Sequence, residues 1–131
     1  MKGLTLRNFL PLASMLAFVF GIGFALIGEP LAALYNVTLN PGGVFVGQLY
    51  GAALIGFGVL NWLARTITDA PALKTIRLAN LISNAIGFVF ALIGQLAGVG
   101  GVNQLGWSTV VIYLLLTLGF AYFQFIKPAG L

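Results

Sequence analysis

The chain has 131 residues, of which 60% are hydrophobic and only 6% are charged. Ordinary soluble domains carry about 25% charged residues, so six basic and two acidic side chains cannot cover a soluble surface. The net charge of +4 is small and scattered, which excludes a nucleic-acid-binding surface. The composition therefore predicts an integral membrane protein with a single domain.

The first predicted span covers residues 8–28 and follows Lys2 and Arg7. Its length of about 20 residues matches the thickness of a bilayer. Because this run exceeds the apolar region of a signal peptide, we interpret it as a membrane helix. The stretch 29–44 after it is rich in proline, asparagine and glycine, which favour breaks and turns.

The second predicted span covers residues 45–64 and carries Gly47 and Gly51. Small residues four positions apart let membrane helices approach each other closely. The segment 65–77 that follows is the most polar loop of the chain. Within it, Asp69 precedes an alanine and a proline, which predicts a helix that begins with Asp69 as its N-cap.

The third predicted span, residues 78–98, has small and polar residues along one face. They recur at spacings of four and three, with large apolar residues between them. This pattern is the reverse of a soluble amphipathic helix and is typical of a helix packed among others in a bilayer. The small and polar positions are Asn80, Asn84, Gly87, Ala91, Gly94 and Gly98.

The fourth predicted span covers residues 107–126 and is rich in leucine, tyrosine and phenylalanine. Gly119 is its only residue suited to close helix approach, so we expect this helix to be the most lipid-exposed. The four spans together predict an all-α fold, with four transmembrane helices in an antiparallel bundle.

The basic residues predict the orientation of the bundle. All six lie before the first span, between the second and third spans, or after the fourth span. They therefore fall on one side of a four-span topology. By the positive-inside rule that side is cytoplasmic, and so are both termini.

A short repeat and a set of small residues predict how the helices pack. Residues 24–28 and 90–94 both read FALIG, which indicates either a duplicated hairpin or a chance match between two apolar helices. We expect helix contacts at Gly21, Ala25 and Gly28 in the first span, Gly47 and Gly51 in the second, and Gly87, Ala91 and Gly94 in the third.

The residues needed for common catalytic chemistry are scarce. The chain has no cysteine and no histidine, so its serines lack the usual activating base. Glu29 and Asp69 are the only carboxylates, and the predicted topology puts them on opposite sides of the membrane. We therefore predict no enzyme activity, no catalytic residue, no metal site and no cofactor.

Polar side chains within the spans are the candidate site. Amides that face hydrocarbon are costly, so these groups should turn inward. One interpretation is a set of interhelical hydrogen bonds. The other is a small pocket of Asn61, Asn80 and Asn84, open to the cytoplasmic leaflet, that receives a lipid headgroup or a partner's polar group. The full polar set is Ser14, Asn61, Asn80, Asn84 and Gln124.

The layout of the chain resembles a known set of proteins. Residues 47–65 read GQLYGAALIGFGVLNWLAR and follow a Glu-Pro-Leu break and an Asn-Pro-Gly turn. In these features the chain resembles short bacterial four-span membrane proteins, which are mostly described as domains of unknown function. The resemblance implies a four-helix fold in the bacterial inner membrane and transfers no catalytic residue.

Two functions fit these observations. The first is a non-catalytic accessory or scaffold subunit that binds another membrane protein, a pigment or a lipid through its helix faces. The second is a small transporter or channel, which would need to be a homo-oligomer because four short helices enclose little room. Neither function involves nucleic acid.

Overall fold

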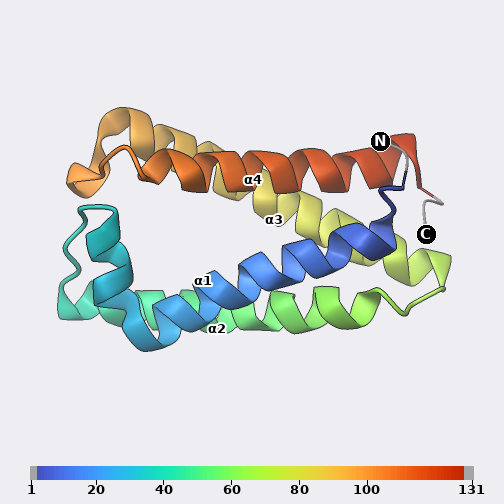
Figure 1. Cartoon of the computed structure of the whole chain (residues 1–131), viewed down its shortest axis with the longest axis horizontal. Coiled ribbons are helices and arrows are strands. Elements are labelled where there is room, and N and C mark those ends of the chain that lie inside the picture. Colours follow the sequence, from blue (N-terminus) through green and yellow to red (C-terminus); the bar gives the residue numbers. More distant parts are fainter. Residues whose placement is uncertain (1–2, 129–131) are drawn as a thin grey trace.

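Four long helices make up the protein in the computed structural model, which describes residues 3–128 (Figure 1). They are α1 (Leu6–Leu34), α2 (Pro41–Ala64), α3 (Ala70–Ala97) and α4 (Gly106–Ala121). A short 3-10 turn, η1 (Val99–Gly101), follows α3, and a π-helical turn, η2 (Tyr122–Ile126), continues α4.

The helices have the length and surface of membrane spans. Their apolar stretches are 21 to 29 residues long, and about 20 residues cross a bilayer. Large apolar side chains such as Leu26, Phe90 and Phe125 are 70% or more exposed. An apolar outer surface of this kind suits contact with lipid. The structure thus confirms the predicted all-α four-helix membrane fold.

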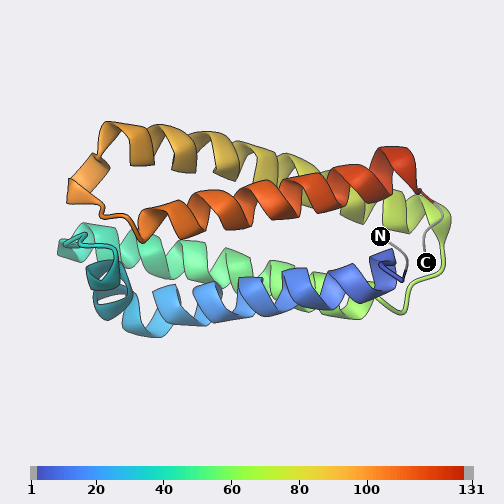
Figure 2. The ribbon, with the colours of Figure 1, turned by 45° about the horizontal axis from the view of Figure 1, so that its top comes forward.

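The four helices form two antiparallel hairpins (Figure 2). The backbones of α1 and α2 pack closely along their length, and those of α3 and α4 do the same. The backbones of α2 and α3 approach each other at few positions. The hairpins therefore meet mainly through side chains, which leaves room between them.

Small residues permit the close packing of α1 against α2. A Cβ atom placed on Gly51 would lie 2.8 Å from the backbone nitrogen of Ala25. A Cβ atom on Gly21 would lie 2.9 Å from the carbonyl oxygen of Gly51. At this point the two backbones touch, so a larger residue would force the helices apart.

The two ends of the bundle differ in charge. One end, called here the basic end, carries both ends of the described chain and the α2–α3 connection (Figure 1). The other, called here the loop end, carries the α1–α2 and α3–α4 connections. The described basic residues at the basic end are Arg7, Arg65, Lys74, Arg77 and Lys127.

The apolar core lies at the basic end. Phe9 of α1 packs edge-on against Phe120, with ring centres 4.9 Å apart, and a Cβ atom on Gly119 would overlap the Phe9 ring. Phe120 and Phe123 are fully buried, and the apolar stretch of α4 with η2 is 17% buried, as are those of α2 and α3, so the fourth helix is not more lipid-exposed than these two. The core consists of Leu6, Phe9, Leu10, Ala13, Ala64, Leu73, Phe120 and Phe123.

Helix α1 bends sharply near the loop end. Ile27 has non-helical backbone angles, φ −134° and ψ 45°, three residues before Pro30. Proline lacks an N–H and its ring collides with the preceding turn, which accounts for the bend. The second FALIG copy, residues 90–94, lies in a helix without such a break. The two copies therefore differ in conformation.

The segment after the bend ties the hairpins together at the loop end. The side-chain nitrogen of Asn36 donates to the carbonyl oxygen of Gly101 at 2.9 Å. The side-chain nitrogen of Asn103 donates to the carbonyl oxygen of Leu34 at 3.0 Å. The two bonds join the end of α1 and the connection that follows it to the α3–α4 connection.

All four helices begin before their predicted spans, α2 and α3 by four residues or more. Helix α2 begins at Pro41, four residues before its predicted span, because Asn40 caps it by accepting from Gly43 N at 2.6 Å. Proline is well suited to the first helical turn, so the Asn-Pro pair starts a helix instead of a turn. Helix α3 begins at Ala70, and Asp69 accepts from its first turn as predicted.

Candidate functional site

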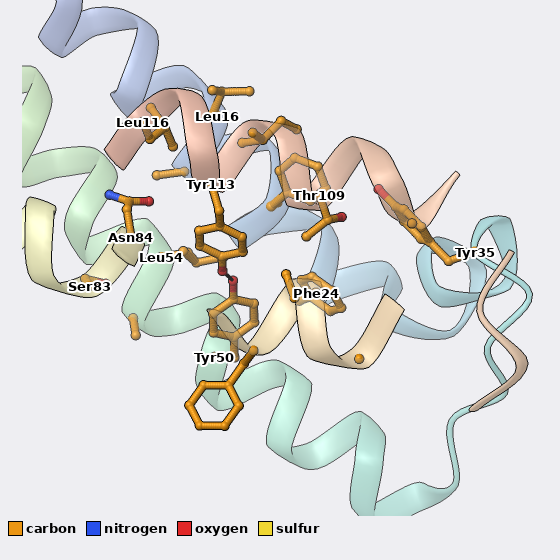
Figure 3. Close-up of a pocket in the computed structure, with 18 of the residues that line it drawn as sticks. Leu16, Phe24, Tyr35, Tyr50, Leu54, Ser83, Asn84, Thr109, Tyr113 and Leu116 are labelled. Carbon is orange, nitrogen blue, oxygen red and sulfur yellow. Dashed lines mark hydrogen bonds between the residues drawn. The ribbon is translucent and has the colours of Figure 1, made fainter. Parts of the chain in front are cut away.

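A cavity of about 630 Å³ lies between the two hairpins (Figure 3). All four helices and both loop-end connections line it. Its volume falls in the range of about 300–1,000 Å³ that is usual for small-molecule sites. Most of the wall is apolar, and its larger side chains include Leu16, Phe20, Phe24, Leu54, Phe57 and Ile112.

Paired amides close the cavity at the basic end. Asn61 donates to the Oδ1 of Asn80 at 2.9 Å, and Asn80 donates back to the Oδ1 of Asn61 at 2.8 Å. Asn80 also donates to the carbonyl oxygen of Ile76 at 2.9 Å. Each of the two asparagines is only 2% exposed. This pair joins α2 to α3 and forms the interhelical hydrogen bond that one sequence interpretation proposed.

The structure corrects the predicted direction of the polar pocket. The sequence interpretation predicted a pocket of Asn61, Asn80 and Asn84 that opens toward the cytoplasmic leaflet. All three do line the cavity. However, the apolar core around Phe9 and Phe120 lies at the basic end. The cavity extends from the amide pair toward the loop end instead.

Asn84 is the member of this group that presents its amide to the cavity (Figure 3). Its Nδ2 donates to the carbonyl oxygen of Asn80 at 2.8 Å. A carbonyl can only accept a hydrogen bond, so the nitrogen must point at Asn80 and the Oδ1 must point away. Within residues 3–128 the structure shows no hydrogen bond to that Oδ1.

Two tyrosines cross the middle of the cavity (Figure 3). The hydroxyl of Tyr50 from α2 is hydrogen-bonded to the hydroxyl of Tyr113 from α4. Gly87 of α3 makes room for the Tyr113 ring, because a Cβ atom there would overlap it. Phe24 packs edge-on against Tyr50 with ring centres 5.4 Å apart.

The sequence interpretation missed the contribution of α4. Thr109, Tyr113 and Leu116 all line the cavity and lie four and three residues apart. This spacing puts them on one helix face, so the signal was present. It was weak because the residues around them are equally large and apolar.

The loop end of the cavity is closed by the two connections. Tyr35 and Val37 after the bend in α1 line it, together with Val99 and Val102. Gln95 of α3 supports this region by donating from Nε2 to the carbonyl oxygen of Asn103 at 3.0 Å. The hydrogen bonds of Asn36 and Asn103 hold these connections against each other.

The cavity wall carries no formal charge in the part of the chain that the structure describes. None of its lining residues is Lys, Arg, Asp or Glu. Its polar side chains are hydroxyls and amides, those of Tyr35, Tyr50, Asn61, Asn80, Ser83, Asn84, Gln95, Thr109 and Tyr113. Within residues 3–128, no group of side chains could hold a metal ion.

Two residues of the predicted polar set lie away from the cavity. Ser14 is fully buried and donates to the carbonyl oxygen of Gly58 at 2.7 Å, which joins α1 to α2. Gln124 accepts from the Nε of Arg77 at 2.9 Å, which joins η2 to α3. Both make contacts between helices outside the cavity.

The predicted small residues divide between helix contacts and the cavity. Gly21, Ala25 and Gly51 meet at the α1–α2 contact, and a Cβ atom on Gly47 would lie 3.6 Å from the Phe24 ring. Gly28 is buried, and a Cβ atom there would lie 3.9 Å from Leu39.

In α3 the small residues have different surroundings. Gly87 packs against Tyr113, but Ala91 and Gly94 line the cavity. A Cβ atom on Gly94 would have no neighbour within 4 Å, so the close helix contact predicted there is absent. These small residues widen the cavity instead.

Comparison with protein-family models, curated protein sequences and solved structures finds no match to this chain. The cavity and the membrane fold around it are therefore the features that bear on function.

Proposed function

We propose that this protein is a non-catalytic membrane subunit that binds a hydrophobic small molecule of lipid class between its two hairpins. The cavity of about 630 Å³, with its apolar wall and few uncharged polar groups, is the observation that carries the proposal. Sites for small molecules typically combine such a wall with a few polar groups that fix orientation. Lipids are the molecules that surround the protein inside a bilayer, so we expect the ligand to be a lipid.

The cavity wall also reaches the outer surface between α2 and α3. Tyr50 of α2 and Phe90 of α3 both line the cavity, and they are 40% and 70% exposed. The backbones of helices α2 and α3 come close to each other at few positions. This arrangement supports entry of the ligand from the surrounding lipid through the gap between α2 and α3.

The closed ends favour a binding protein over a channel. The apolar core fills the basic end, and hydrogen bonds between the connections tie the loop end. A polar solute would have to pass both closures to cross the membrane. A transporter function would require both closed ends of the bundle to open.

The cellular setting of the proposal follows from charge and composition. We propose the bacterial inner membrane, with the basic end and both termini in the cytoplasm, because the basic residues gather there. We further propose that the exposed apolar helix faces bind another membrane protein. The mass of the native complex in mild detergent tests this. A hetero-complex supports an accessory subunit, and a pure homo-oligomer supports the transporter reading.

Native mass spectrometry of the detergent-extracted protein tests the ligand proposal. We expect the wild-type protein to retain a co-extracted lipid-class molecule. Ala53→Phe should abolish retention because Ala53 lines the cavity and a ring would fill it. Ala52→Phe is the matched control, since the neighbouring residue is exposed and lies outside the lining. Equal retention by the two variants would contradict the proposed site.

A further inference from the structure

The hydrogen-bonding groups of the cavity define the chemical class of its ligand. We propose that the ligand is an uncharged single-chain lipid with a hydroxyl head group, and that the hydroxyl binds Asn84. This inference rests on the proposed function. Three features of the site support this class: the free groups of Asn84, the absence of charge in the described wall, and the size of the cavity.

Asn84 offers both halves of a hydrogen-bonding pair. Its Nδ2 uses one hydrogen on the carbonyl oxygen of Asn80, which leaves a second hydrogen and the Oδ1 acceptor. A hydroxyl group both donates and accepts, so it matches this amide completely. An ester or ketone can only accept, and would leave the Oδ1 of Asn84 without a donor.

The neighbouring asparagines do not compete for this role. Asn80 uses both hydrogens of its side-chain nitrogen and its Oδ1 within the protein. Asn61 and Asn80 are also each 2% exposed. They hold the helices together, whereas Asn84, one turn further along α3, is half-buried and meets the cavity. Gln95 is the other half-buried amide of the lining, but it lies at the loop end, where its Nε2 donates to the carbonyl oxygen of Asn103.

The uncharged wall excludes charged head groups. A carboxylate or phosphate in an apolar cavity pays a large desolvation cost unless an opposite charge balances it. The described lining holds no Lys or Arg to provide that charge. A fatty acid anion or a phospholipid head group therefore suits this site poorly, although the surrounding membrane supplies both.

The cavity volume is large enough for one lipid alkyl chain. At about 30 Å³ for each water-sized group, a cavity of about 630 Å³ holds roughly 20 such groups. That is the size of one alkyl chain with a small head. Asn84 lies near the amide pair, so the chain would extend alongside the Tyr50–Tyr113 pair and past Phe24 toward the loop end.

Competition binding tests the proposal. The wild-type protein in dodecylmaltoside is loaded with tritiated oleyl alcohol and challenged with unlabelled oleyl alcohol, methyl oleate, 1-octadecene or oleic acid at pH 8. We expect oleyl alcohol to compete best. The ester and the hydrocarbon should compete on the order of tenfold less well, because each leaves the Asn84 acceptor unpaired. The oleate anion should be weaker still.

Two variants connect this preference to Asn84. Asn84→Leu should lose the preference for the alcohol over the ester while still binding the hydrocarbon, and retained hydrocarbon binding shows that the variant is folded. Gln48→Leu is the matched control, because this amide on α2 lies outside the cavity lining. It should keep the wild-type preference.

The outcomes separate this inference from the proposed function. Equal competition by all the compounds, or an unchanged preference in Asn84→Leu, would overturn the hydroxyl ligand and leave the cavity a general lipid site. Failure of every compound, oleyl alcohol and 1-octadecene included, to bind would overturn the proposed function itself.

Discussion

Tyr50 and Tyr113 join the two hairpins through their hydroxyl groups in the middle of the cavity (Figure 3). Tyr50 belongs to the hairpin of α1 and α2, and Tyr113 belongs to the hairpin of α3 and α4. The hairpins are also joined by the core and the Asn61–Asn80 pair at the basic end and by the tied connections at the loop end, so this bond is a further point of attachment between them.

Removing either tyrosine hydroxyl should show that the two act as a pair. We expect Tyr50→Phe and Tyr113→Phe each to lower the free energy of unfolding by about 1 kcal/mol, because each leaves the partner hydroxyl unpaired. The double variant should lose about the same amount. Unfolding in detergent measures this cycle. Additive losses in the double variant would mean that the bond contributes nothing to stability.

The Asn61–Asn80 pair should show the cost of an unpaired buried amide. We expect Asn61→Leu to lower the free energy of unfolding by about 1–3 kcal/mol, because Asn80 then loses its cross-helix partner in a site that is 2% exposed. Replacing both asparagines by leucine should cost less than the single change. Asn84→Leu serves as a control that removes no hydrogen bond between helices, since the side chain of Asn84 bonds only within α3. A double variant less stable than the single one would contradict this account.

Two glycines of α3 should respond in opposite ways to the same substitution. In Gly87→Ala the new methyl group overlaps the Tyr113 ring, so we expect a lower melting temperature. In Gly94→Ala the methyl group enters open space in the cavity. Helix propensity then favours alanine by up to about 1 kcal/mol, so the melting temperature should stay level or rise. Similar losses in both variants would show that Gly94 makes a helix contact.

Accessibility in intact cells tests the proposed orientation. The chain has no cysteine, so single cysteines can replace the exposed residues Thr38, Lys74 and Gln104. An impermeant thiol reagent should label positions 38 and 104 at the loop end and spare position 74 at the basic end. After cell lysis all three should react. Labelling of position 74 alone in intact cells would reverse the topology.

The sequence was sufficient for the number, type and direction of the helices. Four apolar runs separated by breaks must alternate in direction across a membrane, and Asp69 marked the start of α3 correctly. Inward-facing amides were also predictable, because an amide facing hydrocarbon is costly. The Asn61–Asn80 bond follows from that rule.

The arrangement of the helices around the cavity could not be predicted in the same way. A stripe of small residues indicates either close packing or a hollow, and the two outcomes depend on what lies opposite. Gly87 faces the ring of Tyr113, whereas Gly94 faces open space. The bend at Ile27 also depends on how Pro30 is accommodated, and it determines which residues close the loop end.

Nuclear Overhauser effects (NOEs) between cavity methyl groups and lipid protons test the central claim most directly. The deuterated protein, with methyl-labelled Leu and Ile, would be extracted from protonated membranes into deuterated detergent. We predict NOEs from the methyl groups of Leu54, Ile112 and Leu116 to lipid chain protons. The methyl groups of Leu10, fully buried in the core, should show none. NOEs from the three cavity residues to water, or only to one another across a collapsed space, would contradict the binding cavity.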